Sequence, residues 1–82
     1  SKGMKKNVKK ATKLFRIAAE QGSAEAQYQL GIHLIEGIGC HKNWHAGIKW
    51  LKKSAEQNYD PAKISLSQHD TFFNRMLHKF IK

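Results

Sequence analysis

The chain contains an internal repeat. Residues 3–26 align without a gap with residues 39–62, at an offset of 36 positions, and eight of the 24 aligned pairs are identical. The identical pairs are Gly3/Gly39, Lys6/Lys42, Asn7/Asn43, Lys13/Lys49, Ala19/Ala55, Glu20/Glu56, Gln21/Gln57 and Ala26/Ala62. A period of this length is typical of solenoids, whose units bury their apolar faces only by stacking on neighbouring units. Because stacked repeats present extended binding surfaces, the period favours a protein that binds other proteins.

Apolar residues recur at helical spacing along most of the chain. In the first copy they lie three or four positions apart, at Met4, Val8, Ala11, Phe15 and Ala18. This spacing predicts a helix over about residues 4–19 with one buried stripe. Further helices are expected over residues 24–36, from about residue 43 to residue 56, and from about residue 60 onward. The sequence therefore predicts an all-α fold.

Turn-forming residues separate these segments. Gly22, the segment Gly37-Ile38-Gly39 and Asn58 are expected to adopt left-handed backbone conformations, which glycine and asparagine tolerate. Asn7 is expected at the cap or in the first turn of the first helix. Within the third helix, Gly47 is expected to reduce helix stability by roughly 1 kcal/mol relative to alanine.

The repeat fades from Ser67 onward. Asp70 and Thr71 are typical of a new helix cap, and the apolar residues that follow are Phe72, Phe73, Met76, Leu77, Phe80 and Ile81. We expect this last helix to cover the open end of the stack, as atypical terminal units do in solenoids. An amphipathic helix that binds a membrane surface or a partner is the alternative.

Composition narrows the class of partner. The 82 residues suffice for one small domain, and 15 Lys+Arg against 6 Asp+Glu give a formal net charge of +9. This excess favours an acidic partner, which is nucleic acid, an anionic membrane surface or an acidic protein. The single cysteine excludes an internal disulfide, and no apolar run reaches the roughly 20 residues that span a bilayer. The cellular compartment stays open.

No sequence pattern points to catalysis. A nucleophile with a positioned base, paired carboxylates and a phosphate-binding loop are all missing at recognisable spacing. Cys40, His41 and His45 carry side chains that zinc prefers, but the local sequence offers no fourth ligand. Cys40 is better explained as a small buried residue at the repeat position of Met4. We therefore expect a non-enzymatic protein that needs no metal or other cofactor.

Three segments together resemble a known repeat family. They are Ala26-Gln27-Tyr28-Gln29-Leu30-Gly31, then Glu36-Gly37-Ile38-Gly39-Cys40 followed by Asn43, and Trp50-Leu51-Lys52-Lys53-Ser54-Ala55-Glu56-Gln57. In order and spacing they are similar to the Sel1-like repeat family, relatives of the tetratricopeptide repeats. The resemblance covers residues 3–66. Departures from the family pattern include Leu34 for Tyr, Cys40 for Val and Gly47 for Ala.

The resemblance implies a right-handed α/α solenoid, with the helix of Gly31 on the concave side and the helix of Trp50 on the convex side. Residues 1–66 would form about two repeats, the first lacking its first helix, and residues 67–82 would form a C-terminal capping helix. Members of the family are adaptors and scaffolds, and some are small antagonists of toxins. An open face on the first repeat would also allow a homodimer.

The concave surface is the first candidate for binding. It is expected to hold a protein or peptide partner through Tyr28, Ile32, Ile35, Glu36, Ile64 and Gln68. Two β-branched apolar residues, Ile32 and Ile35, are unusual on a solvated helix face. They either contact the partner or are covered by the last helix.

A basic surface is the second candidate. It consists of Lys6, Lys9, Lys13, Arg16, Lys42, Lys49 and Lys52, which helical spacing places opposite the apolar stripes. Nucleic acid, an anionic membrane, or an acidic toxin or effector would fit this charge. Since no aromatic side chain interleaves these residues, nucleic-acid binding would be independent of sequence and sensitive to salt. A lysine-rich outer face also serves solubility alone.

Overall fold

The described structure is helical throughout apart from its turns. The computed structural model describes the backbone of residues 2–69 and the side chains of residues 7–69. Its helices are α1 (Lys2–Glu20), α2 (Ala24–Glu36) and α3 (Trp44–Glu56), and residues 60–69 are also helical. This part of the chain contains no strand, so the predicted all-α class is confirmed. The expected cap at Asp70 and Thr71, and the helix after it, lie outside the described residues.

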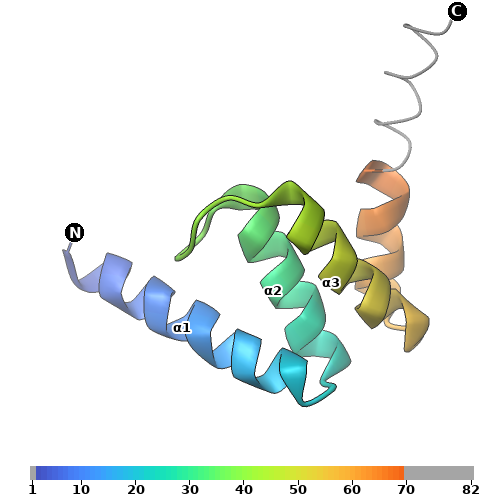
Figure 1. Ribbon diagram of the computed structural model, residues 1–82, viewed down its shortest axis with the longest axis horizontal. Coiled ribbons are helices and arrows are strands. Elements are labelled where there is room, and N and C mark those ends of the chain that lie inside the picture. Colours follow the sequence, from blue (N-terminus) through green and yellow to red (C-terminus); the bar gives the residue numbers. More distant parts are fainter. Residues whose placement is uncertain (1, 70–82) are drawn as a thin grey trace, which may run out of the picture.

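Successive helices pack side by side. Figure 1 shows α2 between α1 and α3, with residues 60–69 beyond α3. The packing contacts run from α1 to α2 and from α2 to α3. Each helix therefore buries its apolar stripe against its neighbours in sequence, as the repeat predicts.

The turns between helices follow from local chemistry. Ser23 caps α2, since its Oγ accepts the backbone N–H of Ala26 at 3.2 Å. Asn43 caps α3 in the same way, its side chain accepting the N–H of Ala46 at 3.1 Å. Each of these bonds satisfies one of the backbone donors that a helix start leaves unpaired.

Positive φ angles occur where they were predicted. The values are 103° at Gly22, 72° at Gly37, 68° at Gly39 and 64° at Asn58. Gly37 ends α2, and its own N–H donates to the carbonyl of His33. Left-handed backbone of this kind closes a helix because it turns the chain away from the axis.

The prediction that Asn7 caps the first helix is wrong. α1 begins at Lys2, so Asn7 lies inside the helix, and Gly3 is helical although its repeat equivalent Gly39 forms a turn. The equivalent Asn43 is held in its cap position because its N–H donates to the carbonyl of Leu34 at 2.7 Å. Within α1 the backbone at Asn7 is helical and needs no cap.

Two core clusters alternate along the stack. The first contains the buried residues Ala19, Ala26, Leu30 and Leu34, against which Phe15, Ala18, Cys40, Ala46 and Trp50 pack. The second contains Ile35, Ile48, Leu51 and Ala62, against which Tyr28, Ile32, Ala55, Tyr59 and Leu66 pack. α2 and α3 contribute to both clusters, and this continuity joins the helices into one core. On α2, the side chains of Ala26, Leu30 and Leu34 are buried.

A polar bridge crosses the ends of three helices. The side-chain amide of Gln57 donates to the Gly22 carbonyl at 2.8 Å and to the Gln27 side chain at 3.0 Å. Gln27 in turn donates to the carbonyl of Ala19 at 3.2 Å. These bonds add side-chain donors to the Ala19 and Gly22 carbonyls where α1 ends, and so they tie the end of α1 to α2 and α3. They also give a structural role to Gln57, one of the residues identical in both copies.

Two glycines set the crossing of α2 and α3. A Cβ added to Gly47 would lie 2.5 Å from Ile35 Cγ1 and 2.7 Å from the Gly31 carbonyl oxygen. A Cβ added to Gly31 would lie 2.9 Å from the Gly47 carbonyl oxygen and from Leu51 Cγ. The missing side chains therefore let the backbones of α2 and α3 approach closely. This packing explains why a glycine stands at position 47, although glycine is a poor helix former.

We expect Gly47→Ala to lower the free energy of unfolding by about 1–2 kcal/mol, because overpacking against Gly31 outweighs the helix propensity of alanine. Propensity alone predicts the opposite sign. Urea denaturation followed by circular dichroism measures the difference. An increase in stability would show that α2 and α3 separate at little cost.

Candidate functional site

The concave candidates fall into exposed and half-buried groups. Ile64 is 59% exposed on the helix of residues 60–69, and Gln68 follows one turn later, also exposed. Tyr28 and Ile32 on α2 are half-buried, because both pack against the second core cluster. The ring of Tyr28 lies 5.6 Å from that of Tyr59, in a tilted arrangement. Part of each of these α2 side chains remains available to a partner.

Ile35 does not belong to this surface. Its side chain is only 9% exposed and lies in the second core cluster with Ile48, Leu51 and Ala62. The sequence left open whether it contacts a partner or is covered. It is covered by α3 and by the helix that follows, because the absence of a side chain at Gly47 leaves room for it.

The polar members of the concave surface are accessible. Glu36 is exposed at the end of α2, one turn beyond Ile32. Sequence reasoning did not select Gln29, although helical spacing of three and four positions places it on the face of Ile32 and Glu36. The exposure pattern of α2 would be needed to find it, since glutamine alone carries no signal of function.

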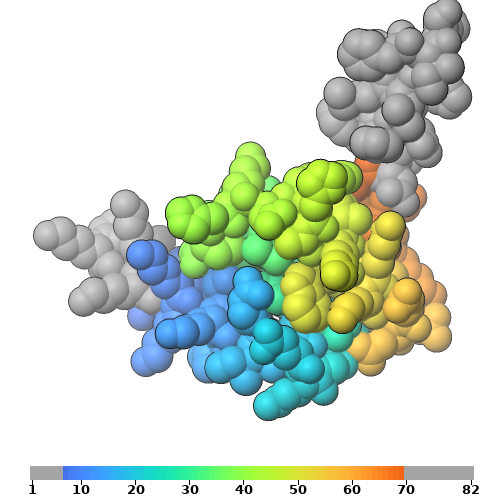
Figure 2. Space-filling model, in the orientation of Figure 1, coloured from blue at the N-terminus to red at the C-terminus, as the bar shows by residue number. Residues whose placement is uncertain are grey.

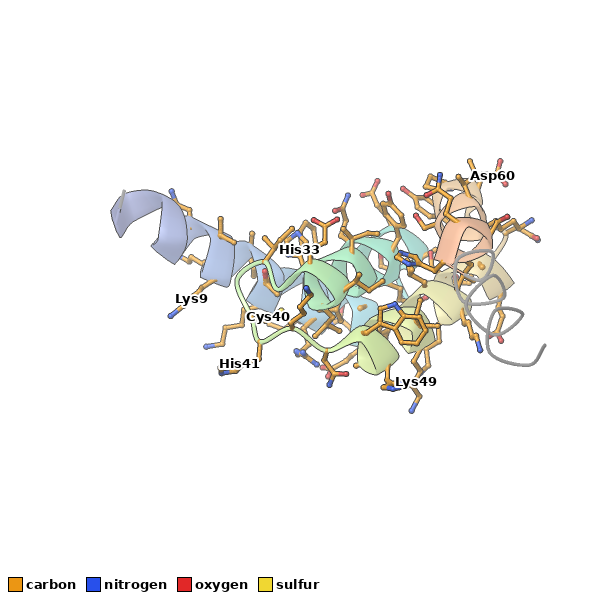
Figure 3. The ribbon with its side chains drawn as sticks, turned by 90° about the horizontal axis from the view of Figure 1, so that it is seen from above. Lys9, His33, Cys40, His41, Lys49 and Asp60 are labelled. Atoms are coloured by element: carbon orange, nitrogen blue, oxygen red, sulfur yellow. The ribbon has the colours of Figure 1, made fainter. Side chains whose placement is uncertain are left out.

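The basic surface is exposed wherever its side chains are described. Lys9, Lys13 and Arg16 on α1, Lys42 in the turn, and Lys49 and Lys52 on α3 are all exposed. The side chain of Lys6 lies outside the described part. Figure 3 shows Lys9, His41 and Lys49 on one side of the molecule and Asp60 on the opposite side.

Charge is divided unequally between the helices. α1 contains seven lysines and arginines against the single acidic residue Glu20, and α3 contains three lysines against Glu56. α2 contains no lysine or arginine and carries Glu25 and Glu36. Among these three helices the positive charge therefore lies on α1 and α3, and α2 is weakly acidic.

The turn between α2 and α3 packs against α1 and is hydrogen-bonded to it. Figure 2 shows the segment after α2 lying against the N-terminal half of α1. Thr12 is only 3% exposed, and its hydroxyl oxygen lies 2.9 Å from the Ile38 carbonyl oxygen, 3.0 Å from the Val8 carbonyl oxygen and 2.7 Å from His33 Nδ1. A hydroxyl has one proton to donate. The hydroxyl therefore donates to one of the two carbonyls at a time, and it can accept a hydrogen bond from His33 Nδ1–H.

His33 on α2 is the third partner in this contact between the turn and α1. Its ring packs edge-on against Phe15, with 5.3 Å between the ring centroids. Burial lowers the pKa of His33 below its ordinary value of 6.5, and the nearby Glu36 carboxylate opposes this effect only in part. Cys40 also lies here, its Sγ donating to the His33 carbonyl at 3.6 Å, and it packs against the first core cluster.

We expect the free energy of unfolding to fall as the pH drops below about 6.5. Because the folded-state pKa of His33 is lowered, the unfolded chain takes up the proton first, and stability is complete only above the unfolded pKa. Urea denaturation at several pH values measures the slope. His33→Gln should flatten this slope. An unchanged slope in His33→Gln would contradict the assignment.

The described residues show no other type of site. Among them, no three His, Cys, Asp or Glu side chains are grouped so that they could hold a metal ion. His41 and His45, which sequence reasoning weighed with Cys40, are both exposed. None of the helices described combines the length and apolar character that a membrane span requires.

Stacked helical hairpins with glycine turns and a shared core define a helical-repeat protein. The sequence model of the Sel1 repeat matches residues 1–23 and 24–59. The chain belongs to the Sel1 repeat family, and the predicted resemblance is confirmed. Proteins of this family generally mediate protein–protein interactions as non-catalytic scaffolds.

Similar proteins come from varied sources. A crystal structure of a Sel1 repeat protein from Oxalobacter formigenes superposes with a TM-score of 0.68 at 40% identity, over 71% of this chain and 24% of that chain. A sel1-like repeat-containing protein of Acanthamoeba polyphaga mimivirus is 46% identical over 43 residues, which are 52% of this chain and 7% of that protein. The rat DAP3-binding cell death enhancer 1 is 35% identical over 65 residues, 79% of this chain and 12% of its own length. This chain thus spans a small part of each relative.

Proposed function

We propose that this chain is a non-catalytic interaction module that holds a protein or peptide partner on its concave surface. The residues that would contact the partner are Tyr28, Gln29, Ile32, Glu36, Ile64 and Gln68. The observation that carries the proposal is the exposure of Ile64, at 59%, on the helix adjoining the half-buried Tyr28 and Ile32 cluster. An apolar residue of this size on an otherwise polar helix face is typical of a contact point for a partner.

Family membership supports the proposal. Sel1 repeats bind protein partners, and the name of the rat relative describes binding to another protein. The partner of this chain is a separate question, because the chain corresponds to only 12% of that relative. An adaptor function needs no reacting groups, which agrees with a sequence that offers no catalytic constellation.

The basic side of the molecule supports a second candidate. The exposed lysines and arginine of α1 and α3 would attract an acidic protein, such as a toxin or effector that the chain antagonises, or nucleic acid or an anionic membrane. Because α2 is weakly acidic, an acidic partner would bind α1 and α3 in preference to the concave surface. Direct contact with nucleic acid or lipid would weaken steeply with salt in gel-shift or vesicle titrations.

We expect Ile32→Ser combined with Ile64→Ser to weaken partner binding at least about tenfold, a loss of roughly 1.4 kcal/mol. Cross-linking affinity capture, with mass spectrometry of the captured proteins, measures the loss for each partner. Circular dichroism checks that the variant stays helical.

The matched control is Lys49→Ser combined with Lys52→Ser, on the exposed side of α3. Partners lost only in the isoleucine variant support the concave surface. Partners lost only in the lysine variant would transfer the binding function to the basic side. Capture that both variants leave unchanged would contradict the proposed function at both surfaces.

A further inference from the structure

Four residues on α1 form an exposed patch, of which only Lys13 belongs to one of the two candidate surfaces. Lys10, Lys13, Leu14 and Ile17 are spaced i, i+3, i+4 and i+7, which places them on one helix face. We call this set the α1 patch. Leu14 and Ile17 are 59% and 51% exposed, whereas the large apolar side chains of α2 lie in the two core clusters. The lysines lie one turn before them, so the patch has an apolar end and a basic end.

The second repeat shows what occupies such a patch. The equivalent positions on α3 are Ala46, Lys49, Trp50 and Lys53. Ala46 and Trp50 pack against the first core cluster, to which α1 contributes Ala19. Lys53 stays at the edge, with its Nζ 5.0 Å from the centre of the Trp50 ring. On α3, Ala46 and Trp50 therefore pack against neighbouring helices. On α1, by contrast, Leu14, the equivalent of Trp50, is 59% exposed.

The positive charge of α1 indicates which kind of helix could bind the α1 patch. Lys10 stands where α3 has the uncharged Ala46, and Lys13 is retained as Lys49. α1 carries seven basic residues and one acidic residue. A second copy of α1 would bring these lysines against each other, which like charges disfavour. Glutamates or aspartates on the incoming helix would instead pair with Lys10 and Lys13.

We propose that the α1 patch binds an acidic amphipathic helix of a partner protein. Apolar residues of that helix cover Leu14 and Ile17, and its carboxylates lie against Lys10 and Lys13. This inference rests on the proposed interaction function but uses a surface other than the concave one. Loss of binding at the α1 patch and loss of binding at the concave surface can therefore be told apart. An anionic membrane is a weaker fit, because only two large apolar residues are exposed there and α1 is already held in the core through Ala19.

The test uses the full chain and a designed peptide of about four helical turns. The peptide carries leucines on one face and glutamates beside them, and a scrambled peptide of the same composition is its control. NMR titration locates binding, and fluorescence anisotropy measures affinity. We expect shifts centred on Leu14 and Ile17, and binding at least about tenfold tighter for the amphipathic peptide than for the scrambled one.

Variants separate the contributions. Leu14→Ser with Ile17→Ser, and Lys10→Glu with Lys13→Glu, should each weaken binding at least about tenfold. The glutamate variant should gain affinity for a peptide whose glutamates are replaced by lysines. Ile32→Ser with Ile64→Ser, on the concave surface, should bind the acidic peptide as the wild type does.

Four results would overturn the proposal. The first is equal affinity for the scrambled peptide, and the second is no gain of affinity when the glutamate variant meets the lysine peptide. The third is self-association of the wild type that Leu14→Ser with Ile17→Ser abolishes. The fourth is binding to phosphatidylserine vesicles through the same residues without binding of the peptide. The third result would identify a second copy of this chain as the occupant, and the fourth a membrane. Lys10, Lys13, Leu14, Ile17 and Ile64 are exposed and Ile32 is half-buried, so circular dichroism of each variant checks that the helices persist.

Discussion

Replacing Leu51 with alanine is expected to lower the free energy of unfolding by about 3–5 kcal/mol. Leu51 is fully buried in the second core cluster, and it packs against Gly31 at the crossing of α2 and α3. The substitution leaves a cavity. The helices cannot move together to fill it, because α2 and α3 are already in close contact at this crossing. Small domains are stable by only about 5–15 kcal/mol in total, so the variant should be partly unfolded at ambient temperature.

Urea denaturation of the Leu51→Ala variant measures this loss, with Leu14→Ala as the matched control. Leu14 is 59% exposed, so its replacement should change stability by no more than about 0.5 kcal/mol. Equal effects at the two positions would contradict the assignment of Leu51 to the core and of Leu14 to the surface.

Gly39→Ala is expected to destabilise the protein by about 2–4 kcal/mol. A part of about 1–2 kcal/mol comes from the left-handed conformation, since φ is 68° at this residue. The rest is steric, because an added Cβ would lie 2.6 Å from Thr12 Oγ1 and 2.7 Å from the Val8 carbonyl oxygen. The methyl group would therefore separate the turn from α1 and disrupt the bond between Thr12 and His33.

Gly22→Ala is the control for the conformational part of the Gly39 effect. Gly22 has φ of 103°, but no atom lies within 4 Å of an added Cβ. Thermal and urea denaturation of both variants should show the larger loss for Gly39→Ala. If the two losses were equal, contact of the turn with α1 would contribute nothing to stability.

The two candidate surfaces differ in chemistry. The candidate concave surface has half-buried apolar side chains on the weakly acidic helix α2, and the basic surface has exposed lysines and arginine on α1 and α3. Because their charges differ, they should select different partners. A scaffold that holds two proteins at once could use both surfaces, and the paired variants proposed above would show this as two independent losses of binding.

The helices and their boundaries could largely be predicted from the sequence. Gly37, Gly39 and Asn58 take left-handed backbone, as expected, and Ser23 and Asn43, which directly precede α2 and α3, cap them. Caps and φ preferences are local properties that depend on a few adjacent residues, so sequence suffices to place them. The inward face of α2 was predictable for the same reason, since helical period alone orients Leu30 and Leu34.

The predictions that failed depended on a neighbouring helix. Asn7 does not cap α1, which begins at Lys2, whereas Asn43 is held at its cap by a hydrogen bond from its N–H to the Leu34 carbonyl. Ile35 is buried because α3 approaches closely at Gly47, and helical period gave no information about that distance.

The sequence by itself determined the repeat, the helical class, the turns and the net positive charge of this protein. Only the tertiary structure decided which apolar residues remain exposed, such as Leu14, Ile17 and Ile64, and which side of the stack carries the charge. The reason is physical: exposure depends on whether another helix lies against a given face. That relation joins residues far apart in the chain, whereas periodicity reports only the orientation of a side chain around its own helix axis.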